Sequence, residues 1–298
     1  MKDIAIEKPF LVDRIKKAYN EEYVEIIKGF NEDRLLTLRV NTNKSDRQEI
    51  IDFFNSKKIE YKVVDWYDNA FIVETNNEKE IFDSDIFNNG KIYIQSLSSM
   101  LPAIIMNPKD NTDILDMTSA PGGKSTLMSN IAPKSRITCY EKDKIRAEKL
   151  KHNISLQGAK NCFVMVGDAT KIEDYYKFDN ILLDSPCSGS GTIMIKNEKT
   201  YDYFSEKLLS NLKITQKKLL EKAITLTKKG GTIVYSTCSI LPEENEDIIQ
   251  PFINQNKVKI EKIKDYNIPL LPCKIDGAIC VKPTQYYEGF FVCKMIKC

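Results

Sequence analysis

Two cysteines follow short apolar segments at positions where a parallel sheet would present them to a ligand. Cys238 comes after residues 232–236, which follow a pair of glycines and are typical of a buried strand. Cys187 follows residues 180–183 in a similar way. Because ligands of open α/β sheets bind beyond the carboxyl ends of the strands, we expect both thiols at that edge. A lone cysteine is more often a small buried core residue, but two in matching places favour chemistry.

A glycine-rich turn joins another predicted strand, residues 113–117, to a helix. The turn consists of Thr118, Ser119, Ala120, Pro121, Gly122, Gly123 and Lys124. Such a turn lets the backbone approach a ligand closely and points free N–H groups at it. The dinucleotide fingerprint G-x-G-x-x-G is absent, and a phosphate loop would need a glycine where Thr118 stands, so the spacing disfavours a nucleotide hydrolase.

Acidic residues follow the next two predicted strands. Glu141 comes about twenty residues after the glycine-rich turn, where a carboxylate would accept hydrogen bonds from a ribose. Asp168 follows residues 162–166 and could accept a hydrogen bond from the exocyclic amine of an adenine. Recognition of an adenosine without a phosphate loop suggests S-adenosylmethionine. Each acid by itself could instead cap a helix.

A thiol at this edge would suit the methylation of a pyrimidine. Carbon 5 of cytosine is too weakly nucleophilic to accept a methyl group directly. Addition of a thiolate to carbon 6 makes the ring enamine-like, so that carbon 5 can attack a sulfonium methyl group. An ordinary thiol, with a pKa of about 8.5, is only a few per cent ionised at neutral pH and needs local activation. The proton on carbon 5 must leave before the thiol is expelled, and a second group near the ring could assist that step.

Strands and helices alternate along residues 91–298, which we expect to form the larger, catalytic domain. This alternation predicts an α/β fold with a parallel sheet and crossover helices. After a short strand at 91–95 and a helix at 96–105, the predicted strands are residues 113–117, 136–140, 162–166, 180–183, 232–236, 258–263 and 289–296.

Residues 1–90 predict a small α+β domain of ferredoxin-like type. The predicted elements are an amphipathic helix or helix pair at 8–30, a strand at 35–41, a helix at 46–57 and strands at 61–64 and 70–75. Polar segments at 76–80 and 88–90 mark the transition to the second domain. Domains of this kind often bind RNA, although no standard aromatic RNA-binding signature is present here.

The composition of the chain excludes several other classes of protein. The 298 residues carry a net charge of +2, from 44 basic and 42 acidic residues, which neither demands nor excludes a nucleic-acid partner. The eight cysteines form no C-x-x-C pair, so we expect neither a zinc site nor disulfides. The start of the chain has no apolar signal core and no segment is apolar enough to span a membrane, so we expect a cytoplasmic monomer with reduced thiols. The single histidine, His152, excludes histidine-based triads, and we expect it at the surface.

The chain resembles the RsmB/Nop (Sun) family of RNA cytosine-5 methyltransferases. The similarity runs from Arg39-Val40-Asn41 to Gly289-Phe290-Phe291. Its most specific segments are Ala120-Pro121-Gly122-Gly123-Lys124, Asp184-Ser185-Pro186-Cys187-Ser188-Gly189, Ser236-Thr237-Cys238-Ser239 and Pro242-Glu243-Glu244-Asn245-Glu246.

The resemblance implies a fold and a role for each of these segments. It implies a class I methyltransferase domain, Rossmann-like, with a seven-stranded sheet and an antiparallel final hairpin, after a small RNA-binding domain. By resemblance, Cys238 is the nucleophile, Cys187 assists release of the product, and Asp184, with Lys124 beside it, holds the polar edge of the cytosine. S-adenosylmethionine would be bound by Thr118, Ser119, Ala120, Pro121, Gly122, Gly123, Lys124, Glu141, Asp168 and Asp184.

The sequence departs from the family pattern at a few positions. Thr118-Ser119 replaces the usual Cys-Ala, Glu141 an Asp, and Ser185 an Ala, which affects the shape of the pocket more than the reaction. The extra N-terminal helical and C-terminal RNA-binding domains of some members are not expected, so RNA choice would depend on residues 1–90 and the catalytic face. We expect ribosomal RNA as the first candidate substrate and transfer RNA as the second.

Two alternatives remain at this point. A DNA cytosine-5 methyltransferase would also carry a Pro-Cys pair, but there the Pro-Cys thiol is itself the nucleophile, so the additional Thr237-Cys238 favours RNA. A catalytically silent RNA-binding or ribosome assembly factor would keep the pocket. The presence of both cysteines and Asp184 gives that alternative no support.

Overall fold

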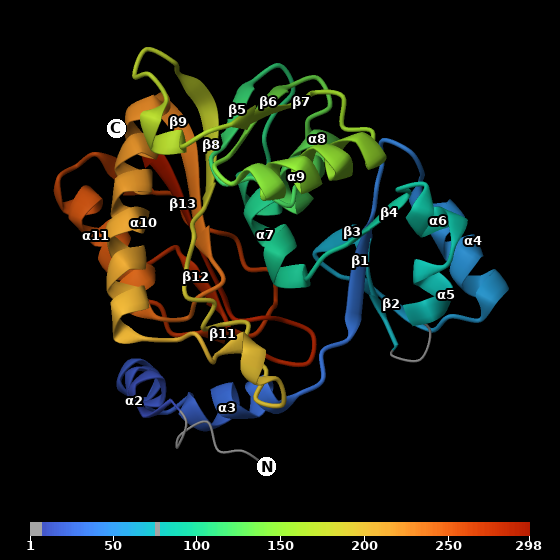
Figure 1. Cartoon of the computed structure of the whole chain (residues 1–298), viewed down its shortest axis with the longest axis horizontal. Coiled ribbons are helices and arrows are strands. Elements are labelled where there is room, and N and C mark those ends of the chain that lie inside the picture. The colour runs from blue at the N-terminus through green and yellow to red at the C-terminus, as the bar shows by residue number, and fades with distance from the viewer. Residues whose placement is uncertain (1–7, 75–77) are drawn as a thin grey trace. The chain divides into compact units, whose positions relative to one another are not determined.

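The computed structural model describes residues 8–74 and 78–298 (Figure 1). The first seven residues, Thr75 at the end of a predicted strand, and Asn76 and Asn77 of the predicted transition lie outside the described residues. The chain groups into two compact units. One joins the described residues up to Arg34 to Ile172–Cys298, and the other comprises Leu35–Lys171. The division into domains 1–90 and 91–298 stays a prediction.

The unit Leu35–Lys171 begins with an antiparallel sheet of strand order β2-β3-β1-β4, with helices on one face (Figure 1). Its core joins Leu38 and Phe71 of the sheet to Ile50 and Phe54 of α4, all fully buried. The elements are β1 (Leu36–Val40), α4 (Arg47–Lys57), β2 (Tyr61–Val64), β3 (Tyr67–Val73), α5 (Glu78–Phe82), α6 (Asp85–Asn88) and β4 (Ile92–Ile94). Apart from α5 and α6, these are the predicted elements.

The helices α5 and α6 correct the prediction of a polar transition. Within the described residues, α5 begins at Glu78 and α6 ends at Asn88, and α5 forms because Ile81 is fully buried in the core of the small sheet. Ser84 then caps α6 by accepting a hydrogen bond from the Phe87 N–H at 3.2 Å. One buried apolar side chain among acids and lysines carries too little periodicity to be recognised as a helix.

The rest of this unit has the predicted alternation of parallel strands and helices. β6 pairs in parallel with β5 on one side and β7 on the other. The elements are α7 (Leu97–Met106), β5 (Asp113–Asp116), α8 (Gly123–Ile131), β6 (Arg136–Glu141), α9 (Lys144–Leu156) and β7 (Cys162–Val166). His152 is exposed on α9, as expected. The carboxyl ends of the strands therefore lead into the glycine-rich turn, Glu141 and Asp168.

The other unit contains β8 (Phe178–Asp184) and β9 (Thr227–Thr237), which pair in parallel. The sheet then reverses, because β13 (Phe290–Lys297) runs antiparallel to β9 and pairs with β10 and β12. This confirms the antiparallel final hairpin. The remaining elements are α2 (Pro9–Ala18), α3 (Tyr23–Asn31), α10 (Glu206–Leu226), α11 (Glu246–Asn254), β10 (Val258–Ile260), β11 (Leu270–Leu271) and β12 (Ile279–Val281), with short 3₁₀ turns at Glu198–Thr200 and Pro242–Glu244.

α10 is the crossover helix that the predicted alternation implies between β8 and β9, although its bounds were not predicted. β11 and β12 were not predicted. Figure 1 shows α10 and α11 side by side, and α10 packs on β8 and β9. α10 has 21 residues and buries Leu209, Leu219, Leu220 and Ala223. Ser205 caps its start by accepting a hydrogen bond from the Leu208 N–H at 3.2 Å. None of the helices in residues 8–74 and 78–298 is long and apolar enough to cross a membrane.

Candidate active site

The two predicted cysteines meet at the carboxyl ends of β8 and β9. The sulfurs of Cys187 and Cys238 are 3.1 Å apart, and both side chains are half-buried. Leu183 lies opposite Tyr235 and Asp184 opposite Ser236 in the parallel register, so the two segments leave the sheet together. The expected juxtaposition of the thiols is confirmed. Their separate roles stay a prediction.

Asp184 ends β8 beside this pair. Its Oδ1 accepts a hydrogen bond from the Ser236 hydroxyl at 2.7 Å, and the next residue, Ser185, donates its N–H to the Ser236 carbonyl at 2.8 Å. Ser236 is fully buried and its side chain fixes the carboxylate of a residue that sequence reasoning assigned to substrate binding. Ser236 itself was singled out only as part of a motif.

A buried carboxylate holds the loop that carries Cys187. Glu244 is fully buried; its Oε1 accepts from the Ser188 N–H at 2.9 Å and from the Gln216 amide at 3.0 Å. Its Oε2 accepts a further hydrogen bond from the Ser188 hydroxyl. Gln216, on α10, also donates to the Pro186 carbonyl at 2.9 Å. The residues on both sides of Cys187 are therefore held by hydrogen bonds to the Glu244 carboxylate and the Gln216 amide.

The segment after Cys238 is fixed by a second set of hydrogen bonds. The Ser190 and Ser239 hydroxyls are 2.8 Å apart, and the Thr237 hydroxyl donates to Asn245 Oδ1 at 2.6 Å. The Gly191 N–H donates to the Cys238 carbonyl at 3.0 Å. A Cβ atom on Gly191 would lie only 1.9 Å from the Gly289 carbonyl oxygen, so the chain here approaches β13 as closely as only glycine permits.

The surroundings of the Cys187 thiol change its pKa. The hydrogen bond to Cys238, followed by burial, raises the pKa of the Cys187 thiol well above its usual value. The Cys187 thiol therefore holds its proton at neutral pH. The carboxylate of Glu244 adds to this effect as a smaller cause.

Tyr203 lies next to the cysteine pair and was missed in the sequence. Its hydroxyl donates to the Ser188 carbonyl at 3.3 Å while about half of the side chain, 51%, is exposed. Burial, then the nearby Cys238 and Cys187 sulfurs, raise the pKa of Tyr203. The residue reaches the site from the loop before α10, and no local pattern marks such a tyrosine.

The glycine-rich turn has a fixed backbone conformation. Gly122 has a φ of +107°, and a Cβ atom there would lie 2.9 Å from the Leu150 side chain, so this position requires glycine. The Ala120–Pro121 peptide is cis. The Arg146 side chain donates to the Ala120 carbonyl at 2.9 Å and Asn153 donates to the Pro121 carbonyl at 2.8 Å. Two side chains of α9 therefore hold the turn in place.

Arg39 fixes the same turn from the small sheet, and sequence reasoning did not find it. The side chain is fully buried and donates to the Gly123 carbonyl at 3.0 Å, to the Thr126 hydroxyl at 2.8 Å and to Gln95 Oε1 at 2.8 Å. Burial lowers the pKa of Arg39 to about 10, so it stays charged at neutral pH. The signal available was the motif Arg39-Val40-Asn41, but nothing in it reveals a partner 84 residues away.

The two predicted adenosine acids already have partners within their own segments. Glu141 accepts from the Asp143 N–H at 2.9 Å and lies 3.5 Å from the Arg146 guanidinium. Asp168 accepts from the Thr170 N–H at 3.0 Å and hydroxyl at 2.7 Å. The hydrogen bonds from Thr170 lower the pKa of Asp168, which keeps it ionised. Because a carboxylate has about four acceptor positions, both acids keep capacity for a ribose or an amine, and they fit an adenosine ligand.

Lys124 lies on the first turn of α8. Its amine donates to the Ser99 hydroxyl on α7 at 2.8 Å. Its role toward a cytosine stays a prediction. Within residues 8–74 and 78–298, no group of three or more His, Cys, Asp or Glu side chains could hold a metal ion, and all eight cysteines are free thiols.

The fold and the site define a class I methyltransferase preceded by a ferredoxin-like domain. A family model described as 16S rRNA methyltransferase RsmB/F matches residues 103–296, and a model of the RsmF/B-like ferredoxin-like domain matches residues 9–78. The chain belongs to the RsmB/F family of methyltransferases. The family and fold are those of S-adenosylmethionine-dependent enzymes.

Curated relatives and solved structures agree with this assignment. Ribosomal RNA small subunit methyltransferase B of Proteus mirabilis is 33% identical over 285 residues, which cover 95% of this chain and 64% of that protein. A methyltransferase homologue from Pyrococcus horikoshii is 28% identical, with a TM-score of 0.84, and covers 98% of this chain and 100% of its own. NSun6 from the same organism, solved with SFG, an analogue of S-adenosylmethionine, has a TM-score of 0.85 at 22% identity, over 96% of this chain and 97% of its own, and supports the fold.

The chain spans less than two thirds of the first of these relatives. It covers 64% of the Proteus mirabilis protein and 59% of the probable methyltransferase B of Bacillus subtilis, to which it is 32% identical over 88% of its own length. The activity and the substrate that these relatives have as full-length proteins are therefore only proposed for this chain.

Proposed function

We propose that this protein transfers a methyl group from S-adenosylmethionine to carbon 5 of a cytosine in RNA. The observation that carries the proposal is the 3.1 Å contact between the sulfurs of Cys187 and Cys238, at the ends of adjacent parallel strands and beside Asp184. Two thiols in one site suit a reaction that needs both a nucleophile and a group that assists its release. The names of relatives favour ribosomal RNA of the small subunit as the substrate. Transfer RNA is the second candidate, on the family resemblance alone.

Cys238 acts as the nucleophile in this scheme. Its thiolate forms a bond to carbon 6 of the cytosine, and the electron pair of the C5–C6 double bond becomes available at carbon 5. The bound cofactor supplies an electrophilic methyl group at a sulfonium centre. Asp184, held by Ser236, accepts hydrogen bonds from the amine edge of the base and keeps the ring in position.

Cys187 changes character during the reaction. In the free site its pKa is raised chiefly by the hydrogen bond to Cys238. Once Cys238 is bonded to carbon 6, its sulfur is a thioether and a weaker hydrogen-bond partner, so the largest cause of the raised Cys187 pKa is reduced. The Cys187 thiol then releases its proton to solvent, and the resulting thiolate accepts the proton from carbon 5. The electron pair of that C–H bond restores the C5–C6 double bond and expels the Cys238 thiolate.

The residues around Cys187 and Cys238 suit a cytosine that is not stacked in a helix. Tyr203 presents a half-exposed ring beside the two sulfurs, and such a ring can stack on a base. Removing a cytosine from a helix costs a few kcal/mol, so an unpaired cytosine is the expected target.

The test is methylation with labelled cofactor. Total RNA and DNA from cells that lack the protein would each be incubated with the wild-type chain and with Cys238→Ala, and bisulfite sequencing would locate the modified base. We expect wild-type label in ribosomal RNA, as 5-methylcytosine, and none with Cys238→Ala. Label in DNA, or at a position other than carbon 5, would refute the proposal.

A further inference from the structure

A basic pocket of about 810 Å³ lies at the amino ends of β6 and β7. Arg136 is the first residue of β6, and Lys160 and Asn161 directly precede β7. The predicted cofactor acids follow the opposite, carboxyl ends of the same strands. The pocket is therefore separate from the cofactor site and has no part in the chemistry proposed above. The residues that line it include Lys134, Arg136, Lys160, Asn161 and Phe163.

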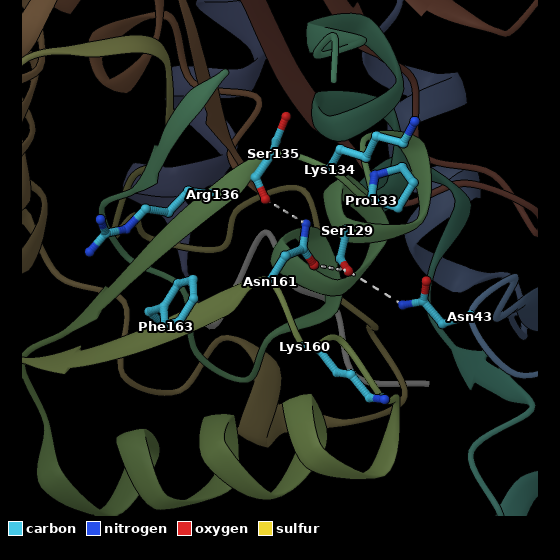
Figure 2. Close-up of a pocket in the computed structure, with 10 residues that line it drawn as sticks. Asn43, Ser129, Pro133, Lys134, Ser135, Arg136, Lys160, Asn161 and Phe163 are labelled. Atoms are coloured by element: carbon cyan, nitrogen blue, oxygen red, sulfur yellow. Dashed lines mark hydrogen bonds between the residues drawn. The ribbon is translucent and has the colours of Figure 1, made fainter. Parts of the chain in front are cut away.

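Three cations line this pocket and no carboxylate does. Figure 2 shows the side chains of Lys134, Arg136 and Lys160 on different sides of it. In the part of the chain that the structure describes, neither Lys134 nor Lys160 forms an ion pair with an acid. Two acids flank the pocket: Asp110 accepts from the Lys134 N–H at 3.0 Å, and Asp113 stands opposite Arg136 in the strand register. In a chain of net charge +2, the pocket still concentrates positive charge.

The floor of the pocket is organised before any ligand binds. The Asn161 amide donates to the Ser135 carbonyl at 2.9 Å and to the Ala132 carbonyl at 3.1 Å. The Ser129 hydroxyl donates to Asn161 Oδ1 at 2.5 Å, and Asn43 donates to Ser129 at 3.3 Å, as Figure 2 shows. A ligand would therefore bind without first ordering this floor, which favours affinity.

An aromatic ring stands among these polar groups. Phe163 on β7 is 47% exposed, although the Arg136 guanidinium lies 5.4 Å from its ring centroid. A site that binds only phosphate does not need an exposed aromatic ring. An exposed aromatic side chain beside lysines is the arrangement that proteins use for unpaired nucleic acid, in which bases stack on the ring while cations meet the backbone. Duplex RNA is instead recognised through its phosphates and 2′-hydroxyls.

We propose that the basic pocket binds an unpaired segment of RNA away from the methylated cytosine. Lys134 and Lys160 contact its phosphates, and a base stacks on Phe163. The inference rests on the proposed function only in that the substrate is RNA. Binding here would extend RNA recognition beyond the catalytic edge and the ferredoxin-like domain.

The experiment measures binding of the full chain to oligo(U) of about 12 nucleotides and to an RNA duplex of similar length, by anisotropy over a range of salt concentrations. Lys134→Ala with Lys160→Ala should lower the slope of log K against log salt by about 1.4 for oligo(U). Phe163→Ala should weaken oligo(U) binding about fivefold or more. The matched control, Lys149→Ala with Lys151→Ala, removes the same charge from the exposed face of α9 and should leave the slope unchanged.

Two further measurements keep the result decisive. S-adenosylhomocysteine should bind every variant as it binds the wild type, which shows that the fold and the cofactor site are intact; if Phe163→Ala does not fold, Phe163→Leu should show the same loss. With 4-thiouridine in the oligonucleotide, crosslinks should map to residues 160–166. Wild-type affinity in the pocket variants, or an equal loss for the duplex, would overturn the proposal. Failure of methylation with intact pocket binding would instead refute only the proposed reaction.

Discussion

The Cys187 thiol depends on a carboxylate that the sequence marks only as part of a motif. Glu244 is fully buried, and its three hydrogen bonds join Ser188 of the cysteine loop to Gln216 of α10. Hydrogen bonds to a buried charge contribute more than neutral ones, at about 1.5–3 kcal/mol each. Glu244 is therefore a positioning residue that holds the cysteine loop through Ser188 and Gln216.

Replacing this carboxylate should affect both stability and turnover. Glu244→Gln keeps the size of the side chain but directs an N–H₂ group at Ser188, so we expect the free energy of unfolding to fall by about 1–3 kcal/mol. We also expect a covalent protein–RNA adduct to accumulate, because Cys187 loses its position. Urea unfolding and a denaturing gel measure the two effects. Glu243→Gln is the control: Glu243 pairs with Arg14 near the surface at 3.0 Å, so its loss should cost about 1 kcal/mol or less and leave turnover unchanged.

Among the helices and strands, those that could be predicted are the ones marked by a local pattern in the sequence. The strands 113–117, 136–140, 162–166 and 232–236 were identified from apolar segments next to glycines or acids, and the structure confirms them. Because the ends of parallel strands share an edge, the meeting of Cys187 and Cys238 was also predictable. The partners of the site residues were not predictable, since Ser236, Gln216 and Arg39 act through hydrogen bonds between segments far apart in the sequence.

Arg39 provides a test of how one element positions another. Arg39→Lys keeps the charge but loses the guanidinium fork, so Gln95, Thr126 and the Gly123 carbonyl lose donors. We expect the free energy of unfolding to fall by about 2–4 kcal/mol and S-adenosylhomocysteine to bind several-fold more weakly. Calorimetry measures both quantities. Arg14→Lys, at a partly exposed ion pair, is the matched control and should change stability by about 1 kcal/mol or less. Unchanged cofactor binding in a destabilised Arg39→Lys would limit Arg39 to a role in folding.

On the scale of the whole molecule, the free thiols link stability to pH. Burial raises the pKa of Cys273 to about 12 and raises the pKa of Cys280 and Cys293 well above the usual range. Folded chains keep these protons at pH values where unfolded chains release them, so unfolding releases protons. The stabilisation is therefore complete below a pH of about 8.5 and falls as the pH rises, by up to about 1.4 kcal/mol per pH unit for each thiol.

Urea unfolding at pH 8 and pH 10 measures this effect. We expect the wild type to be less stable at pH 10, and Cys293→Ala to lose less stability between the two pH values, by up to about 1.4 kcal/mol per pH unit. Cys298→Ala, at an exposed position, should follow the wild type. If Cys293→Ala shows the wild-type slope, the buried thiol does not contribute to the pH dependence.

The most direct test of the central claim is a denaturing gel of the protein with its RNA and S-adenosylmethionine. If Cys238 adds to the base and Cys187 assists its release, Cys187→Ala should accumulate a covalent protein–RNA adduct that carries the transferred methyl group. Cys238→Ala should form neither adduct nor product, and the wild type should form product with little adduct. A stable adduct from Cys238→Ala, or methylation by it, would contradict the assignment of the two sulfurs.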